Sequence, residues 1–225
     1  MVLSPDEKPR RASGTAGKMT PAANNDDLTH SYVGTRDEPF VCFTAGTAIL
    51  CERGEKLIET LRFGDLVQTM DHGLQPVRWI GRRSIPGTGA MAPICFEKGA
   101  IGNDKKLLVS PRHKVLLGGW RAELQFGTEE VLVAAKYLIN GDTIYQRQMP
   151  VVDYVHILFD RHEIVQSNGC ASESYHPSAR SMSVLDQAAR AEILAIFPEL
   201  EWCAESYGET ARQCLTAHET QVLLS

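Results

Sequence analysis

One cysteine lies where a thiol could attack its own backbone. Cys42 opens the apolar run "CFTAGTAILC", directly after a polar segment that ends near residue 38. Attack by this thiol on the carbonyl carbon of Val41 would turn the Val41–Cys42 peptide bond into a thioester. The preceding segment would then be an acyl group awaiting a second nucleophile. The reaction also needs a group that polarises the amide, an acid for the leaving nitrogen and donors for the oxyanion.

Two later segments carry side chains that could supply this help. "LLVSPRHKVLL" places Ser110 three residues before His113, between two β-type runs, so both side chains can face one peptide bond across a turn. "YVHILFDRHEIVQSNG" places His162 two residues after Asp160. His156 lies in the same segment with no motif around it, and a lone histidine in a strand is usually a structural residue.

Taken singly, these residues also have ordinary explanations. A cysteine entering an apolar run is most often a buried core residue. A metal cluster is a further alternative, because thiolate and imidazole suit zinc. Its members would be widely separated, however, and lack the usual local ligand spacing. They would be Cys42, His113, His156 and His162.

The composition limits the classes of function. The 225 residues are 43% hydrophobic and carry a net charge of −5, with no basic patch beyond the short cluster at 8–11, so we expect no nucleic-acid partner. We find no secretory signal and no run of the ~20 apolar residues that spans a bilayer. We therefore expect no membrane partner, no cofactor, and a cytoplasmic protein or one exported by a signal-independent route.

The elements that must position these residues fall into three zones. Residues 1–38 are polar and rich in Gly, Pro and Asn, which predicts a flexible tail. Residues 39–177 carry short β-type runs separated by turn signals, which predicts a compact, mainly β unit. These runs include "KLIETL", "DLVQTM", "VRWIGR", "KVLLGG", "EVLVAA" and "YVHILF".

Residues 178–225 change to helical periodicity, which predicts a helical C-terminal extension. One helix begins near Ser183 and Asp186 and stops at Pro198. A second is expected around "ETARQCLTAHETQVLL".

The order of the motifs is more specific than any one of them. The chain runs from "CFTAGT" through "LRFGDLVQTMDHGLQPVRWIG" and "VSPRH" to "YVHILFDRHEIVQSNG". This order resembles the Hedgehog/intein (Hint) superfamily, in particular the bacterial Hint domains found outside conventional inteins. The resemblance implies a compact, horseshoe-like all-β fold with C-terminal α-helices, acting once and autocatalytically on its own N-terminal segment.

The resemblance also implies roles for the candidate residues. Cys42 matches the nucleophile of the N–S acyl shift. His113 matches the histidine that contacts the scissile amide, and Ser110 stands where the family usually has threonine. His162 matches the histidine of the penultimate strand motif, with Asp160 as a nearby partner.

The C-terminal side departs from the splicing pattern. Splicing inteins end in His-Asn, whereas the corresponding position here is Glu173-Ser174, and neither residue can cyclise as asparagine does. Asn168-Gly169 is better explained as a hairpin turn than as a cleavage site. We therefore expect N-terminal cleavage without full splicing, with water or a thiol as the acyl acceptor. The alternative is a Hint-fold binding or cargo module with little cleavage, since the β-branched Val41 crowds the scissile carbonyl.

Overall fold

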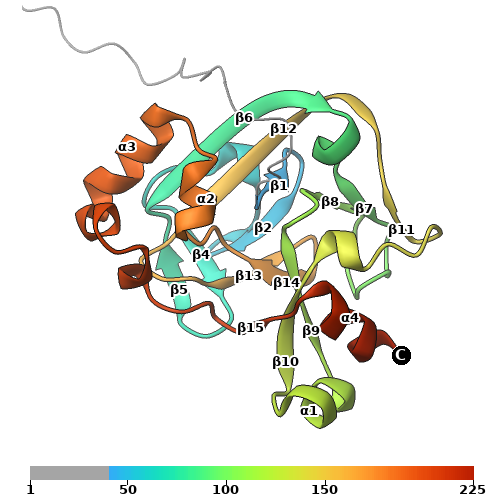
Figure 1. The fold of residues 1–225 in the computed structure, drawn as a ribbon. Coiled ribbons are helices and arrows are strands. Elements are labelled where there is room, and N and C mark those ends of the chain that lie inside the picture. Colours follow the sequence, from blue (N-terminus) through green and yellow to red (C-terminus); the bar gives the residue numbers. More distant parts are fainter. Residues whose placement is uncertain (1–40) are drawn as a thin grey trace, which may run out of the picture.

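The computed structural model describes residues 41–225, which form two β-sheets with helices at the periphery (Figure 1). The flexible tail predicted at 1–38 lies outside the described residues. A six-stranded sheet has the order β11-β7-β8-β1-β12-β6. Its strands are β1 (Phe43–Thr44), β6 (Trp79–Gly87), β7 (Ile94–Phe96), β8 (Leu107–Val109), β11 (Ile144–Gln146) and β12 (Met149–Leu158).

The nine-stranded sheet follows the order β15-β10-β9-β14-β13-β2-β4-β5, with β3 paired to β2. Its strands are β2 (Ala48–Cys51), β3 (Gly54–Leu57), β4 (Leu66–Thr69), β5 (Gly73–Pro76), β9 (Lys114–Gly118), β10 (Glu130–Ala134), β13 (Ile164–Ser167), β14 (Cys170–Glu173) and β15 (Gln213–Cys214). The α-helices are α1 (Trp120–Phe126), α2 (Ala179–Ser183), α3 (Gln187–Ile196) and α4 (Ala217–Leu224). Short 3₁₀ turns are η1 (Ile58–Thr60), η2 (Gly89–Met91), η3 (Ala135–Tyr137), η4 (Pro198–Glu201) and η5 (Ala204–Tyr207). The prediction of a mainly β fold with C-terminal helices is confirmed.

Strand β1 is short but central, because it pairs antiparallel with both β8 and β12. Phe43 lies opposite Val155 on β12 and Val109 on β8, and all three belong to the main hydrophobic core. Successive side chains of a strand point to opposite faces. Cys42 accordingly packs on the other face, with Val152 and Tyr154.

The C-terminal helices cover this second face. Trp79 and Leu158, which are paired on β6 and β12, share a buried apolar cluster with Tyr175 and with side chains from α2, α3, η4 and η5. The members from this extension are Met182, Ile193, Phe197, Leu200 and Tyr207. Figure 1 shows α2 and α3 lying beside β6 and β12. The extension therefore closes the side of the sheet on which Cys42 lies.

The predicted helix near Asp186 is present, and the second is half as long as expected. Asp186 caps α3, since its side chain accepts a hydrogen bond from Ala189 N–H, and the 3₁₀ turn η4 begins at Pro198. In the second segment only α4 is helical, starting from a capping box between Thr216 and Glu219. Residues 213–214 instead form β15, which pairs parallel with β10. Pairing with β10 therefore outweighs the helical preference of residues 213–214.

The Asn168-Gly169 pair forms the predicted hairpin turn between β13 and β14, with Ser167 paired to Cys170. Both turn residues have positive φ, 47° and 81°, as a type I′ turn requires. The Asn168 amide is fully engaged, since its Oδ1 accepts from Ala48 N–H and its Nδ2 donates to the Lys106 carbonyl. This bonding holds the side chain away from attack on its own backbone.

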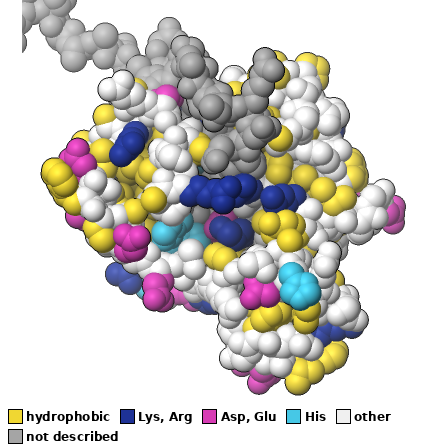
Figure 2. All heavy atoms as spheres, in the orientation of Figure 1, with side chains coloured by type: hydrophobic (Ala, Val, Ile, Leu, Met, Phe, Trp, Pro, Cys, Tyr) yellow, Lys and Arg dark blue, Asp and Glu magenta, His cyan; other side chains and the backbone are white. Residues whose placement is uncertain are grey.

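The face shown in Figure 2 carries both signs of charge, with Lys and Arg gathered in one short band and acidic side chains scattered around it. Within residues 41–225 no helix combines the length and apolar character needed to cross a bilayer.

Candidate active site

Cys42 is almost fully buried, at 1% exposure, and its thiol contacts His156, which was expected from the sequence to be a structural residue. Its Sγ lies 3.1 Å from His156 Nε2 and 3.3 Å from Nδ1. His156 Nδ1 is also 2.7 Å from the carbonyl oxygen of Val41. A carbonyl can only accept, so Nδ1 carries the hydrogen, and Nε2 of the neutral ring is unprotonated and within reach of the thiol. One imidazole therefore contacts both the nucleophile and the carbonyl that it would attack.

Antiparallel register explains how these residues meet. Phe43 is paired with Val155 and Thr44 with Tyr154. Continuing this register one residue before β1 brings Cys42 opposite His156. The two residues are separated by 114 positions in the sequence. Local pattern alone could not have found His156. The only sequence signal was its place in the long apolar run that became β12.

Ser110 holds the backbone of Cys42 from the other side. The Cys42 N–H donates to Ser110 Oγ at 2.9 Å, and the Ser110 N–H donates to the Cys42 carbonyl at 2.9 Å. The N–H of the Val41–Cys42 peptide bond thus donates a hydrogen bond to the Ser110 hydroxyl. The sequence had assigned this contact to His113.

His113 is fully buried and packs against Phe43, the residue after Cys42. The two rings meet edge-on, with their centroids 4.3 Å apart. Neither ring nitrogen finds a hydrogen-bond partner within the part of the chain that the structure describes. Burial lowers the pKa of His113 to about 3, against a partial opposing effect of the Glu173 carboxylate. The imidazole is neutral at physiological pH.

Burial also sets the charge state of the thiol and its partner. It raises the pKa of Cys42 well above the usual range, although the Arg83 guanidinium and the Ser110 hydroxyl act in the opposite direction. Burial lowers the pKa of His156 to about 4, while the hydrogen bond to Val41 opposes and Arg83 adds to that shift. At neutral pH the pair is therefore a thiol beside a neutral imidazole, which can act as a base.

Comparison with protein families decides the assignment. A family profile described as "Hint domain" matches residues 41–179, which is more than half of the chain. The chain belongs to the Hint domain family. A self-processing domain, in general terms, is what this membership supports.

Solved structures similar to this Hint domain are intein-like, at low identity. A bacterial intein-like domain from Clostridium thermocellum is 16% identical, with 60% of this chain and 98% of that chain covered and a TM-score of 0.42. The MchDnaB-1 intein is 13% identical, with 59% and 99% covered and a TM-score of 0.40. The AceL NrdHF class 3 split intein, as a splice-inactive variant, is 14% identical, with 60% and 97% covered and a TM-score of 0.40. A search of curated proteins returned no match.

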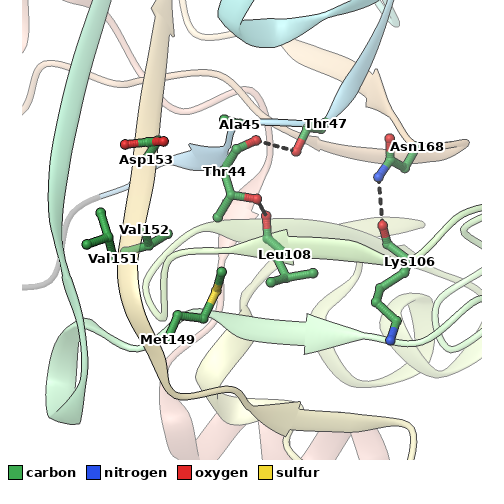
Figure 3. Close-up of a pocket in the computed structure, with 11 residues that line it drawn as sticks. Thr44, Ala45, Thr47, Lys106, Leu108, Met149, Val151, Val152, Asp153 and Asn168 are labelled. Atoms are coloured by element: carbon green, nitrogen blue, oxygen red, sulfur yellow. Dashed lines mark hydrogen bonds between the residues drawn. The ribbon is translucent and has the colours of Figure 1, made fainter.

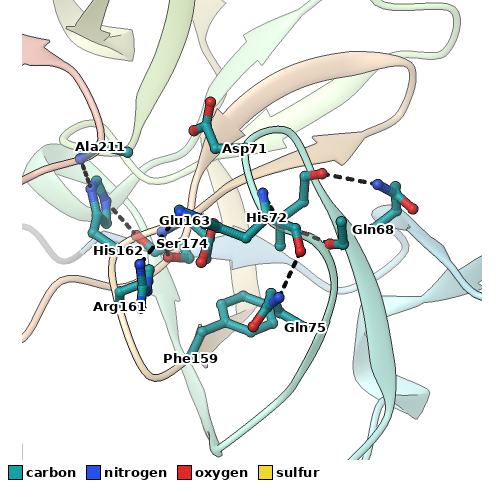
Figure 4. A network of polar contacts seen from close by, with 12 residues as sticks. Gln68, Asp71, His72, Gln75, Phe159, Arg161, His162, Glu163, Ser174 and Ala211 are labelled. Carbon is teal, nitrogen blue, oxygen red and sulfur yellow. Dashed lines mark hydrogen bonds and ion pairs between the residues drawn. The ribbon is translucent and has the colours of Figure 1, made fainter.

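The late segment of this Hint domain holds His162 in fixed contacts rather than at the nucleophile (Figure 4). Its Nδ1 accepts from the Ala211 N–H at 2.9 Å, and its Nε2 lies 3.2 Å from the Ser174 carbonyl oxygen. Asp160 does not join this group. Its carboxylate, 53% exposed, forms an ion pair with Arg78 instead.

Glu173, and not the predicted partner Asp160, is the carboxylate beside His162. Its buried carboxylate lies 2.9 Å from Lys114 Nζ and 3.3 Å from His162 Nε2. Burial alone would raise the pKa of Glu173, but Lys114, His162 and His113 together lower it to about 2. Glu173 is therefore an ionised member of a buried ion pair with Lys114.

In the described part of the chain no group of three or more His, Cys, Asp or Glu side chains is placed to hold a metal ion, so the metal-cluster alternative gains no support. A cavity of about 270 Å³ borders β1 next to Thr44 and Asn168, but Cys42 does not line it (Figure 3). The hydroxyl of Thr44 donates to the Leu108 carbonyl, and that of Thr47 to the Thr44 carbonyl. These wall groups are engaged within the protein.

Proposed function

We propose that this Hint domain cleaves its own Val41–Cys42 bond through a thioester. The observation that carries the proposal is the single buried His156 ring, which contacts both Cys42 Sγ and the Val41 carbonyl oxygen. Geometry of this kind holds a nucleophile, its base and the electrophile together before reaction.

In the first step, His156 Nε2 takes the thiol proton as Cys42 Sγ forms a bond to the carbonyl carbon of Val41. Negative charge develops on the carbonyl oxygen, where the His156 Nδ1–H already donates. In the second step the C–N bond breaks, and the proton held by His156 passes to the leaving nitrogen. No oxidant or reductant is involved, and the product is a thioester with a free amine on Cys42.

Two further residues are assigned supporting roles. Ser110 holds the scissile nitrogen through its hydroxyl and would keep the peptide plane oriented for attack. His113 remains assigned as a helper on the strength of the family motif, and a His113→Gln variant tests it. The contacts of His162 and Asp160 favour a structural role for both.

The thioester would be resolved by water or by a small thiol, with release of residues 1–41. Two-sided splicing is not proposed. Glu173 is committed to its ion pair, Ser174 cannot cyclise, and the Asn168 amide is held by two hydrogen bonds.

The test is the intact mass of the full chain, incubated with and without a small thiol. We expect thiol-dependent release of residues 1–41, and no release from Cys42→Ala with an unchanged far-UV spectrum. Equal release from Cys42→Ala would refute the proposal. A parent chain that stays intact in thiol would favour the alternative of a binding module, in which the β-branched Val41 blocks attack.

A further inference from the structure

An aromatic side chain from β6 borders the histidine of the proposed site. The Trp79 indole lies 6.0 Å from the His156 ring between centroids, at an interplanar angle of 30°. Tyr175 meets the same imidazole edge-on at 5.1 Å and contacts Trp79 at 5.9 Å. His156 is therefore bounded by two flat side chains in addition to Cys42.

A glycine makes room for this arrangement. Gly81 is paired with His156 across β6 and β12. A Cβ atom at Gly81 would lie 2.3 Å from Trp79 Cη2 and 2.8 Å from Cζ2, well inside any tolerable contact. The indole thus lies directly on the backbone of residue 81, beside the strand position that carries His156.

The indole is anchored from a distant part of the chain. Trp79 Nε1–H donates to Glu192 Oε2 at 2.8 Å, across 113 residues. Glu192 lies on α3, whose neighbouring Ile193 is fully buried in the cluster that contains Trp79. A buried indole N–H needs a hydrogen-bond partner, and here the C-terminal extension supplies it.

We propose that Trp79 is a positioning residue for His156, and that Glu192 on α3 fixes Trp79 in that role. The effect on cleavage rests on the proposed function, whereas the effect on His156 does not. The second side-chain torsion of a histidine is broad and is not fixed by rotamer preference. The flat neighbours restrict that torsion, so that Nδ1 stays on the Val41 carbonyl while Nε2 stays on the thiol.

The same rings keep water from the imidazole. The ionisable side chains around His156 are those of Cys42, Arg83, Tyr175 and His113. None of these four is a carboxylate that could hold His156 protonated at neutral pH. Loosening the Trp79 contact would therefore admit water and raise the pKa of His156 from about 4 toward the ordinary value of about 6.5.

The experiment follows His156 by NMR titration of the full-length Cys42→Ala chain, in which no cleavage occurs. We expect Trp79→Phe to raise the titration midpoint by about one pH unit or more, since phenylalanine lacks the N–H and the second ring. Glu192→Leu should shift the midpoint in the same direction. Glu192→Gln, which keeps an acceptor oxygen, should restore it. Glu199→Leu is the matched control, an exposed glutamate of the same extension.

Cleavage of the Cys42 chain gives the second measurement. A misplacement of about 1 Å can cost about 100-fold in rate. We expect losses of about 10- to 100-fold in Trp79→Phe, partial loss in Glu192→Leu and none in Glu199→Leu. An unchanged His156 midpoint in folded Trp79→Phe and Glu192→Leu would overturn the inference. If the parent shows no Cys42-dependent cleavage, the proposed function fails, and the titration alone still decides the role of Trp79.

Discussion

The two ends of this Hint domain use buried polar groups in opposite ways. At the N-terminal junction Cys42 and His156 are both neutral, because burial raises the pKa of the thiol and lowers that of the imidazole to about 4. At the late end Glu173 is ionised, with a pKa of about 2, and is paired with Lys114. Cys42, His156 and Glu173 are all buried, whereas the Lys114 side chain is 23% exposed. The proposed cleavage moves a proton between the two neutral groups of the first site.

The difference shows that burial and unusual pKa values do not by themselves mark a reactive site. His162 has partners on both ring nitrogens, and Glu173 holds an ammonium and a backbone N–H. The polar atoms of His162 and Glu173 therefore already have partners within the folded domain. The contacts of His156 are instead with the thiol and the carbonyl that would react. The first site therefore differs in that the contacts of its histidine are the groups that would react in the proposed cleavage.

The largest expected effect is a difference in cleavage rate between variants of His156 and of His162. His156→Gln should slow cleavage by about 10²- to 10⁴-fold, because general base help of this kind is lost. His162→Gln should cleave at close to the parental rate. Rates are measured by intact mass in thiol, with far-UV spectra to confirm folding. Comparable losses in both variants would mean that the late site also takes part in the chemistry.

The next effect concerns stability at the late end. Lys114→Met leaves the Glu173 carboxylate buried without its ammonium, and removing one partner of a buried pair costs about 3 kcal/mol or more. Urea unfolding should show this loss in the free energy of unfolding.

Lys105→Met is the matched control, because it breaks an exposed pair with Glu55 whose lysine is 55% exposed. Such pairs are worth less than about 1 kcal/mol. Equal costs for the two variants would contradict a structural role for the buried pair.

The smallest effect is the pH dependence of thioester formation. His156 must be unprotonated to accept the thiol proton, so the rate should be flat near neutrality and fall below a pKa of about 4. At one pH unit below the pKa the neutral fraction, and with it the rate, should be about tenfold lower. Aliquots are quenched into denaturant with excess thiol at neutral pH, which cleaves existing thioester while no more forms.

His113 is the control for this profile, since burial lowers its pKa to about 3 and it could produce a similar limb. His113→Gln should keep the fall in rate near pH 4. If the rate of His113→Gln no longer fell near pH 4, His113 rather than His156 would be the base that accepts the thiol proton.

Much of the architecture was predictable, because it depends on local pattern. The β-type runs, the Asn168-Gly169 turn and the Asp186 cap of α3 each follow from nearby residues. Ser110 was identified from a short motif, and its contact with Cys42 N–H places it at the scissile bond. The second predicted helix is present as α4, but it occupies only the last part of the expected segment, because residues 213–214 pair with β10 instead.

The pairing of reactive groups was not predictable by the same means. His156 reaches Cys42 only through the register of β1 against β12, which no neighbouring residue reveals. His113 has a recognisable motif but no hydrogen bond to the scissile amide, whereas His156 has the contact without a motif. Register is a property of the whole sheet, and a motif found along the chain does not determine it.

The placement of β1 has a consequence for the order of events during synthesis. Its partners β8 and β12 end at Val109 and Leu158, and Trp79 over His156 is held from Glu192. A ribosome delivers Cys42 long before any of these residues. The contacts on which the proposed cleavage depends are therefore complete only once residues up to Glu192 have been made. Contacts between residues so far apart in the sequence are slow to form, so the proposed cleavage would follow folding of the domain rather than precede it.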